Sequence, residues 1–381
     1  MSPDQARTTS SSSSQVKEIQ EAVRRHARVL ATGGGSKPAL STPGDDGVVR
    51  IDVSPLRGIL FYDPEEFTFS AWAGTPVAAV AADLAQNGQH LPFDPPLSAQ
   101  GATLGGTVAA GANGSGRYRY GGVRDFLIGV RFVDGRGNLL QGGGKVVKNA
   151  AGFDFPKLMV GSLGRLGILT ELTFKVFPAP RSTASLRADF ATLDAGLDAV
   201  VRLGRSTFDL EGVDLVATAK GVSLWLRVGG LADTLPGRME RISDFLTDRS
   251  EPVRIERFEN GEKGVVHWKE MASMEWAPED GLLVKVPVTP TKVRQVDAAW
   301  ASQGAIRRYS VGANVAWVAW PGSTRALHDS LADAGLAGVV LRGSSGHPWV
   351  GRPTGRRFLE RIAAALDPDD KFGAVRSWPT S

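Results

Sequence analysis

The chain has 381 residues, 42% hydrophobic and 22% charged, so it is long enough for two or three domains and too apolar to be disordered. Its formal net charge of +4 is too small to indicate nucleic-acid binding. The absence of cysteine excludes disulfides, a thiolate-held iron–sulfur cluster, a cysteine zinc site and a thiol nucleophile. Glycine is in excess, with 46 residues, which raises the question of where the backbone approaches a ligand.

The first 15 residues predict a disordered tail and no targeting signal, since they hold a Ser/Thr run and no apolar stretch. No uncharged apolar run reaches the ~20 residues that a membrane-spanning helix needs. We therefore expect a cytoplasmic protein that is attached to an inner membrane, if at all, through partner subunits.

Residues 16–180 predict a first domain of mixed strands and helices. Apolar residues at helical spacing begin at Val16. The expected strands cover residues 28–32, 48–53, 59–62, 67–73, 127–134, 139–141 and 168–177, and a helix covers residues 77–87. Pro178-Ala179-Pro180 then marks a domain boundary.

Residues 181–381 predict a second domain with an antiparallel sheet and helices on one face. Short alternating strands at residues 222–228, 282–288 and 314–320 are separated by helix-like stretches. The two parts together indicate an α+β fold.

Glycine clusters at the ends of strands are the main chemical signal. Gly33-Gly34-Gly35-Ser36 follows a predicted strand, and Gly105-Gly106-Thr107 opens a predicted short helix. Unhindered backbone N–H groups and a helix N-terminus are what a diphosphate requires. Either cluster alone is equally compatible with a tight turn. Together they favour a large cofactor that carries phosphate.

Several other site classes lack their signatures in this sequence. There is no GxGxxG motif after a strand, no GxxxxGK[ST] motif and no GxSxG motif, which argues against a nicotinamide-binding Rossmann domain, a P-loop and a nucleophile elbow. The five histidines are scattered, with no pair at i, i+4. We therefore expect no metal site.

A third cluster carries a resemblance to a known family. Lys148 to Asp154 (K-x-x-x-G-F-D) leads into residues 158–171 (L-x-V-G-S-x-G-x-L-G-I-L-T-E). This pattern resembles the PCMH-type FAD-binding domain of the vanillyl-alcohol-oxidase superfamily, and residues 33–37, 103–109 and 121–126 fit the same domain. The resemblance implies FAD as cofactor. It also implies a two-subdomain FAD-binding domain over residues 16–180 and a smaller α+β cap domain over residues 181–381.

Within that superfamily, residues 57–64, 74–76 and 88–96 resemble the FAD-binding subunits of bacterial glycolate oxidases. This implies an FAD-dependent oxidoreductase that converts glycolate or D-lactate to glyoxylate or pyruvate by hydride transfer to flavin. Electrons would pass to a larger FAD subunit and an iron–sulfur subunit, and activity would require the complex. The alternatives are a stand-alone dehydrogenase of another 2-hydroxy acid and a flavin-free structural subunit.

The resemblance implies a set of cofactor-binding residues. They are Gly33, Gly34, Gly35, Ser36 and Lys37 on one side of the diphosphate, Gly105, Gly106 and Thr107 on the other, Gly111 and Gly114 along the dinucleotide, Lys148, Gly152 and Asp154 at the flavin, Gly161, Ser162, Gly167 and Ile168 near the adenosine, together with Thr75 and Asp125. A structural ion pair between Lys148 and Asp154 is the alternative to direct contact.

Departures from the family pattern shape two further expectations. Flavinylated relatives carry a histidine in the first loop or a cysteine in the second, and this chain has neither, so FAD is expected to be non-covalent. Relatives that oxidise 2-hydroxy acids alone carry a paired-histidine metal site, of which only Gly346-His347 remains here. We assign no catalytic residue, and regard Arg342 or Arg352 as candidates to bind a substrate carboxylate.

Overall fold

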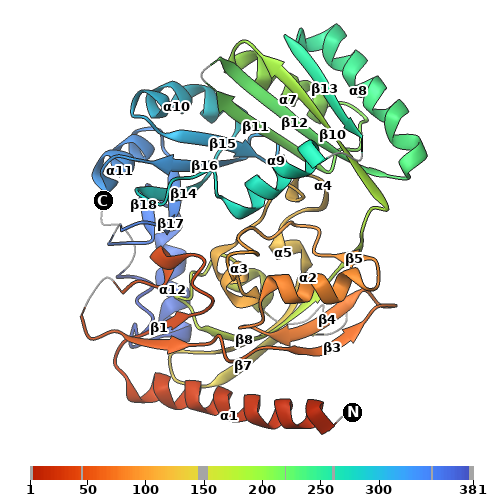
Figure 1. Cartoon of the computed structure of the whole chain (residues 1–381). Helices are drawn as coiled ribbons and strands as arrows, with labels where there is room; N and C mark the ends of the chain where they lie inside the picture. Colours follow the sequence, from red (N-terminus) through yellow and green to blue (C-terminus); the bar gives the residue numbers. More distant parts are fainter. Residues whose placement is uncertain are drawn as a thin grey trace.

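The computed structural model describes residues 3–43, 46–144, 153–218, 220–259, 262–344 and 346–376. These residues form two domains that face one another, with the first domain below and the second above in Figure 1. The chain passes from the first domain to the second between β9 (Phe177–Pro178) and β10 (Ser182–Phe190). The mixture of helices and largely antiparallel sheets confirms the predicted α+β class.

The first domain contains a small parallel sheet and a larger antiparallel one. β1 (Val29–Thr32) pairs in parallel with β2 (Val49–Asp52). The five-stranded sheet has the order β3 (Ile59–Asp63), β4 (Thr68–Trp72), β8 (Ile168–Lys175), β6 (Leu127–Val133), β7 (Leu139–Gly143). β5 (Gln89–His90) pairs with β9.

Short helices cover the face of the larger sheet that is turned toward the second domain (Figure 1). They are α2 (Val77–Ala85), α3 (Leu104–Ala110), α4 (Arg117–Tyr120) and α5 (Val123–Phe126), while η1 (Pro38–Leu40) follows β1 and α6 (Phe155–Met159) precedes β8. Apolar side chains of α2, α3 and the sheet share one hydrophobic core. The loops between these helices therefore lie at the domain interface.

The second domain is built on one antiparallel sheet of nine strands. Their order is β13 (Arg254–Glu259), β10, β12 (Gly221–Gly230), β11 (Gly212–Thr218), β15 (Ile306–Ser310), β16 (Val315–Trp320), β14 (Leu282–Pro287), β17 (Ala337–Arg342), β18 (Trp349–Gly351). Helices α7 (Leu193–Gly204), α8 (Leu235–Ser250), α10 (Pro290–Ser302) and α11 (Thr324–Asp333) pack against one face, with η2 (Ala232–Thr234) before α8.

The other face of this sheet is turned toward the first domain. Alternate residues of β16 lie on the two faces. Val315, Trp317 and Ala319 belong to the core shared with the first domain, whereas the alternate residues Ala316, Val318 and Trp320 pack under the helices. This is the period of two expected for a strand buried on both faces. α9 (Glu262–Ser273) lies on the first-domain side of the sheet (Figure 1).

The C-terminal segment differs from the expected division, because it returns to the first domain. After α12 (Arg356–Leu366), Val29 donates to the Lys371 carbonyl at 3.0 Å, and Gly135 donates to the Leu366 carbonyl at 2.8 Å. The Lys371 ammonium donates to the Val23 carbonyl at 2.7 Å. Residues 367–376, which follow α12, thus pack with the first domain.

The N-terminal helix also differs from its expected extent. α1 spans Pro3–Arg25 and includes most of the segment that was expected to be a disordered tail. Val16, Ile19 and Val23 are buried against the first domain at helical spacing, as predicted from Val16 onwards. The helix simply continues N-terminal to the residues that anchor it. Within the described ranges, no helix combines the length and apolarity that crossing a membrane requires.

Candidate functional site

The two glycine loops meet and enclose a small cavity of about 80 Å³ in the first domain. The first loop follows β1, and the second is the start of α3, where the Thr103 hydroxyl accepts the Gly106 N–H at 3.1 Å. A Cβ on Gly34 would lie 1.9 Å from the Gly101 carbonyl oxygen, so the backbones approach so closely that only glycine fits. The sequence therefore brings the two loops to one place, where the Gly105 N–H donates to the Ala73 carbonyl at 2.7 Å.

Eight of the predicted site residues line this cavity. They are Gly33, Gly34, Gly35, Ser36, Lys37, Gly105, Gly106 and Ile168. Gly161 and Ser162 lie beside α3, since the Gly161 N–H donates to the Val108 carbonyl at 3.0 Å. Gly111 ends α3 in a left-handed conformation. Gly114 lines a second cavity, described below.

The remaining predicted residues have structural contacts or lie outside the described residues. The Thr75 hydroxyl donates to the Trp72 carbonyl at 2.6 Å, and Asp125 accepts the Gly122 N–H at 2.8 Å. Asp154 caps α6 and forms an ion pair with Lys157 at 2.8 Å, which lowers the pKa of its carboxyl group. Gly167 precedes β8, where a Cβ would meet Phe132 at 2.7 Å. Lys148 and Gly152 lie outside the described residues, so their roles stay predictions.

Three polar groups near the loops fit a missing anionic ligand. The hydroxyl oxygens of Thr107 and Ser162 are buried, and neither has a hydrogen-bond partner among the described residues. Lys37 is only 6% exposed, and burial lowers its pKa to about 8. Buried donors without acceptors cost free energy unless a ligand supplies oxygen atoms. Together with the glycine N–H groups, these donors fit a diphosphate.

A larger cavity of about 470 Å³ lies between the two domains. Its lining residues include Val77, His90, Leu91, Asp94, Ser98, Gly114 and Ser115 from the first domain, and Glu211, Arg227, Trp268, Met271, Ser310 and Trp317 from the second. Apolar and aromatic walls with a few polar groups are typical of cofactor and ligand sites, and the volume is in the usual range.

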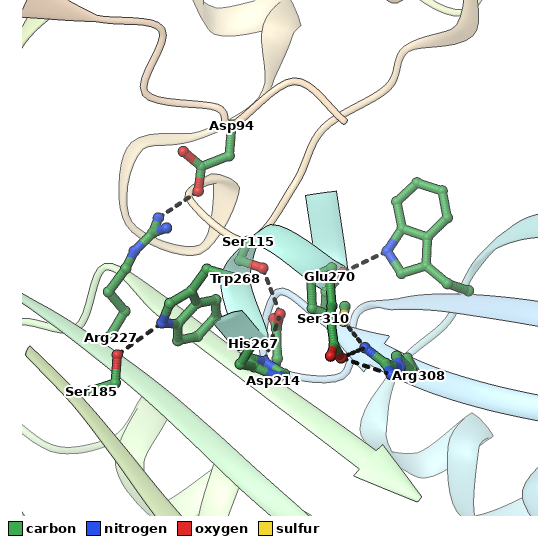
Figure 2. A network of polar contacts seen from close by, with 12 residues as sticks. Asp94, Ser115, Ser185, Asp214, Arg227, His267, Trp268, Glu270, Arg308 and Ser310 are labelled. Carbon is green, nitrogen blue, oxygen red and sulfur yellow. Dashed lines mark hydrogen bonds and ion pairs between the residues drawn. The ribbon is translucent and has the colours of Figure 1, made fainter. Parts of the chain in front are cut away.

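Arg227 joins the two domains at the edge of this interface cavity. Its guanidinium group forms an ion pair with Asp94 of the first domain and lies 3.7 Å from Glu211, as Figure 2 shows for Asp94. Burial acts to lower the pKa of Arg227, but the two carboxylates raise it above its ordinary value. The charge of Arg227 is therefore neutralised within the protein.

A second polar link crosses the interface at Ser115, whose hydroxyl donates to Asp214 Oδ2 at 2.5 Å (Figure 2). Asp214 is fully buried, and burial raises its pKa to about 7. His267 Nε2 lies 3.9 Å from the same oxygen, and its ring stacks on Trp225. Burial and the nearby Arg308 lower the pKa of His267 to about 3, so the imidazole is neutral.

Asp214 makes stability depend on pH in a defined direction. Because its pKa is higher in the folded chain than in the unfolded one, the proton it binds stabilises the fold below about pH 4, and this contribution is lost as the pH rises toward 7. Between pH 5 and 8, Asp214 should lower the free energy of unfolding of the parent by roughly 2–3 kcal/mol. In Asp214→Asn this part of the decrease should be absent. Thermal or urea unfolding at both pH values measures it.

Asp329→Asn is the matched control, because Asp329 pairs with Arg325 on the surface of α11. The control should keep the parent's dependence of stability on pH. If Asp214→Asn keeps it as well, the carboxyl group is ionised throughout this range and the raised pKa is wrong.

Apart from Gly114, sequence reasoning missed the residues of the interface cavity. The sequence feature that could have pointed to this interface is a charged residue within an otherwise apolar strand. Asp214 in β11 and Arg227 in β12 are two examples. Arg342, a predicted carboxylate-binding candidate, instead donates to the Ala277 carbonyl at 2.7 Å. Neither it nor Arg352 lines the interface cavity.

Comparisons with known proteins agree with this geometry. Residues 3–143 match a family described as FAD binding domain. The chain is 37% identical over 215 residues to glycolate oxidase subunit GlcE of Escherichia coli (strain K12), an alignment that covers 56% of this chain and 59% of the subunit. It is 37% identical over 148 residues to a D-lactate dehydrogenase of Anaerostipes hadrus, covering 39% of this chain and 31% of that enzyme. The matched region thus spans less than two thirds of either relative.

Among solved structures, p-cresol methylhydroxylase with substrate bound matches with a TM-score of 0.75 at 15% sequence identity. The match covers 96% of this chain and 88% of the methylhydroxylase chain. At this identity the likeness concerns the fold alone, and it confirms the fold class predicted from the sequence.

Proposed function

We propose that this chain, whose residues 3–143 match the FAD binding domain family, is the FAD-binding subunit of a glycolate oxidase complex. The observation that carries the proposal is the meeting of two glycine loops beside buried hydroxyl groups that have no hydrogen-bond partner among the described residues. The similarity to GlcE supports the subunit role, and the similarity to a D-lactate dehydrogenase supports a 2-hydroxy acid as substrate.

The described residues fit FAD in two parts. The first loop and Lys37 would hold the diphosphate, and Gly105 and Gly106, having no side chains, would let it approach the start of α3 closely. The interface cavity, with the indole rings of Trp268 and Trp317 in its wall, would take an aromatic ring system. When bound, FAD supplies the acceptor for the hydride that leaves the 2-carbon of a hydroxy acid.

The chain's own residues would form and close the reaction chamber. Asp94 and Arg227, both in the wall of the interface cavity, hold the two domains together across it. Ser115 lines that cavity and donates its proton to Asp214, which fixes the direction of the hydroxyl group. Because Arg227 is already neutralised by two carboxylates, it offers little charge to a substrate carboxylate.

This arrangement supports a role within a complex. We propose a larger FAD subunit and an iron–sulfur subunit as partners, with a small 2-hydroxy acid as the substrate of the assembly. The chain has no cysteine with which to hold an iron–sulfur cluster, so electrons from its flavin would leave through a neighbouring subunit.

The complex can be tested by co-expression of the tagged chain with the proteins encoded beside it. We expect them to co-purify and to reduce an artificial electron acceptor with glycolate or D-lactate. Preparations in which this chain is omitted should lose that activity. If full activity remains without the chain, the proposed function is wrong.

We expect FAD to be bound without a covalent link, because the first loop has no histidine and the chain has no cysteine. Acid precipitation of the purified protein should release all of the yellow flavin into the supernatant. Flavin absorbance in the supernatant and in the redissolved pellet measures the outcome. Flavin that stays in the pellet would contradict this expectation.

A further inference from the structure

A third cavity lies where the C-terminal segment returns to the first domain, and we call it the C-terminal cavity. Its volume is about 820 Å³, and its lining comes from residues 29–48, Arg165, residues 343–348 and residues 371–376. It shares no lining residue with the cavity between the glycine loops. Pro38 and Ala39 line the C-terminal cavity, whereas Leu40 lines the other, so η1 separates the two.

The charged side chains in the wall of the C-terminal cavity are basic. Arg165, Lys371 and Arg376 line it together with His347, and none of the described residues that line it is acidic. Asp370, outside the wall, forms an ion pair with Arg376 at 3.0 Å. Lys371 donates to backbone carbonyls, and no described carboxylate forms an ion pair with it or with Arg165. Three cations beside one carboxylate leave an excess of two positive charges.

Two of these cations come together at one point of the wall. A Cβ built on Gly373, which lines the cavity, would lie 3.3 Å from Nη2 of Arg376 and 3.9 Å from Nη1 of Arg165. Both guanidinium groups therefore lie within 4 Å of the same position. Like charges at this separation repel each other unless an anion lies between them.

Arg165 also has a donor that the chain does not use. Its Nη1 donates to the Phe372 carbonyl at 3.1 Å, but its buried Nε has no hydrogen-bond partner among the described residues. Burial, and after it the charge of Arg376, lower the pKa of Arg165, while Asp370 acts to raise it. A cation withdrawn from water without a counter-charge is unfavourable, so this wall is suited to an anionic ligand.

We propose that the C-terminal cavity binds an organic phosphate, a phosphate monoester whose charged group lies against Arg165 and Arg376. A monoester carries about 1.5–2 negative charges at pH 7, which matches the excess in the wall. Guanidinium groups bind phosphate through pairs of N–H groups. The cavity is much larger than one phosphate group, and Val29, Val48 and Phe372 in its wall would contact the organic part.

The bound phosphate would connect segments that are remote in the sequence. Arg165 precedes β8 in the first domain, and Arg376 belongs to the segment that follows α12. A ligand held by both side chains would fasten the C-terminal segment to the first domain, so it should raise the temperature of unfolding. The inference does not depend on the proposed FAD site, because the two cavities have separate linings.

The test measures the binding of phenyl phosphate, inorganic phosphate and benzoate to the full chain by isothermal titration calorimetry, with FAD in excess. Arg165→Gln and Arg376→Gln each remove one guanidinium group from the wall. Arg136→Gln is the matched control, because Arg136 also donates to the C-terminal part of the chain, at the Ala365 carbonyl, 2.8 Å away, but does not line the cavity. Thermal unfolding without ligand shows whether each variant is folded.

We expect phenyl phosphate to bind to the parent and to Arg136→Gln with equal affinity. Inorganic phosphate should bind more weakly, because it lacks the organic part, and benzoate should bind about tenfold more weakly, because it has the same ring but a single charge. Arg165→Gln and Arg376→Gln should each weaken the binding of phenyl phosphate at least about tenfold, the effect of one hydrogen bond to a charged group. Arg165→Lys, which keeps the charge, should restore part of the loss.

Three results would overturn the inference. The first is a parent chain that binds neither phosphate. The second is Arg165→Gln and Arg376→Gln variants that bind phenyl phosphate as tightly as Arg136→Gln does, because the phosphate would then lie elsewhere. The third is benzoate that binds as tightly as phenyl phosphate, because the cavity would then be a carboxylate site.

Discussion

Gly106→Val is expected to weaken FAD binding at least ~100-fold while leaving the chain folded. A Cβ on Gly106 would meet one atom within 4 Å, the Thr103 hydroxyl oxygen at 3.1 Å, and the residue lines the cavity between the two glycine loops. The added side chain would therefore enter the space proposed for the ligand, and the Thr103 hydroxyl would have to shift slightly to admit it. Displacement of the diphosphate from the first loop and Lys37, at ~1.5–3 kcal/mol for each of two lost hydrogen bonds to a charged group, accounts for the expected loss of affinity.

Gly237→Val is a matched control for this variant. Gly237 lies in α8 of the second domain, where a Cβ would meet only Arg241 at 3.7 Å. Titration with FAD gives the affinity of each variant, and thermal unfolding without FAD shows whether it is folded. If Gly106→Val retains stoichiometric FAD, the second loop does not hold the diphosphate. Gly34 is a poorer choice, because the 1.9 Å approach to Gly101 would disturb the loop itself.

The second large effect concerns activity: the isolated chain, loaded with FAD, is expected to reduce its flavin at least ~100-fold more slowly with glycolate than the assembled complex does. Oxidation of a hydroxy acid requires a cation for its carboxylate and a base for its hydroxyl proton, and a general base alone contributes ~10²–10⁴-fold. In the interface cavity Arg227 is neutralised by Asp94 and Glu211. The carboxyl group of Asp214 lies behind Ser115 and is half protonated near pH 7.

Anaerobic mixing of the pure chain with excess glycolate, and separately with D-lactate, measures this rate from the loss of flavin absorbance. Photoreduction of the same sample is the control, and it should bleach the flavin completely. Fast and complete bleaching by either hydroxy acid would show that the chain is a competent dehydrogenase. The stand-alone enzyme of the sequence analysis would then be the better account.

The parts of the site that could be predicted from the sequence are those formed by neighbouring residues. Gly33 to Lys37 and Gly105 to Thr107 are short segments whose glycines predict a backbone that a ligand can approach closely. The structure brings the two segments to one cavity. The strands were predicted for the same reason, since alternation along β16 is a property of six consecutive residues.

The interface residues could not be predicted, because their partners are remote in the sequence. Asp94 meets Arg227 across 133 positions, and Ser115 meets Asp214 across 99. Periodicity places such a residue on a face of its own strand but does not say which loop of another domain faces it. The contact of Arg165 was missed for the same reason: its acceptor, the Phe372 carbonyl, is 207 positions away, and a backbone carbonyl leaves no mark in a sequence.

The return of the C-terminal segment determines the order in which the molecule can be completed during synthesis. The carbonyl of Lys371 accepts the N–H of Val29, the first residue of the strand that leads into the first glycine loop. A contact between residues so far apart forms late, because the loop between them must close first. The cofactor-binding half, although encoded first, would gain its last anchor only after the whole second domain has left the ribosome. Shortening the chain after Leu366 should therefore make the N-terminal half, and not the C-terminal half, the first target of a protease.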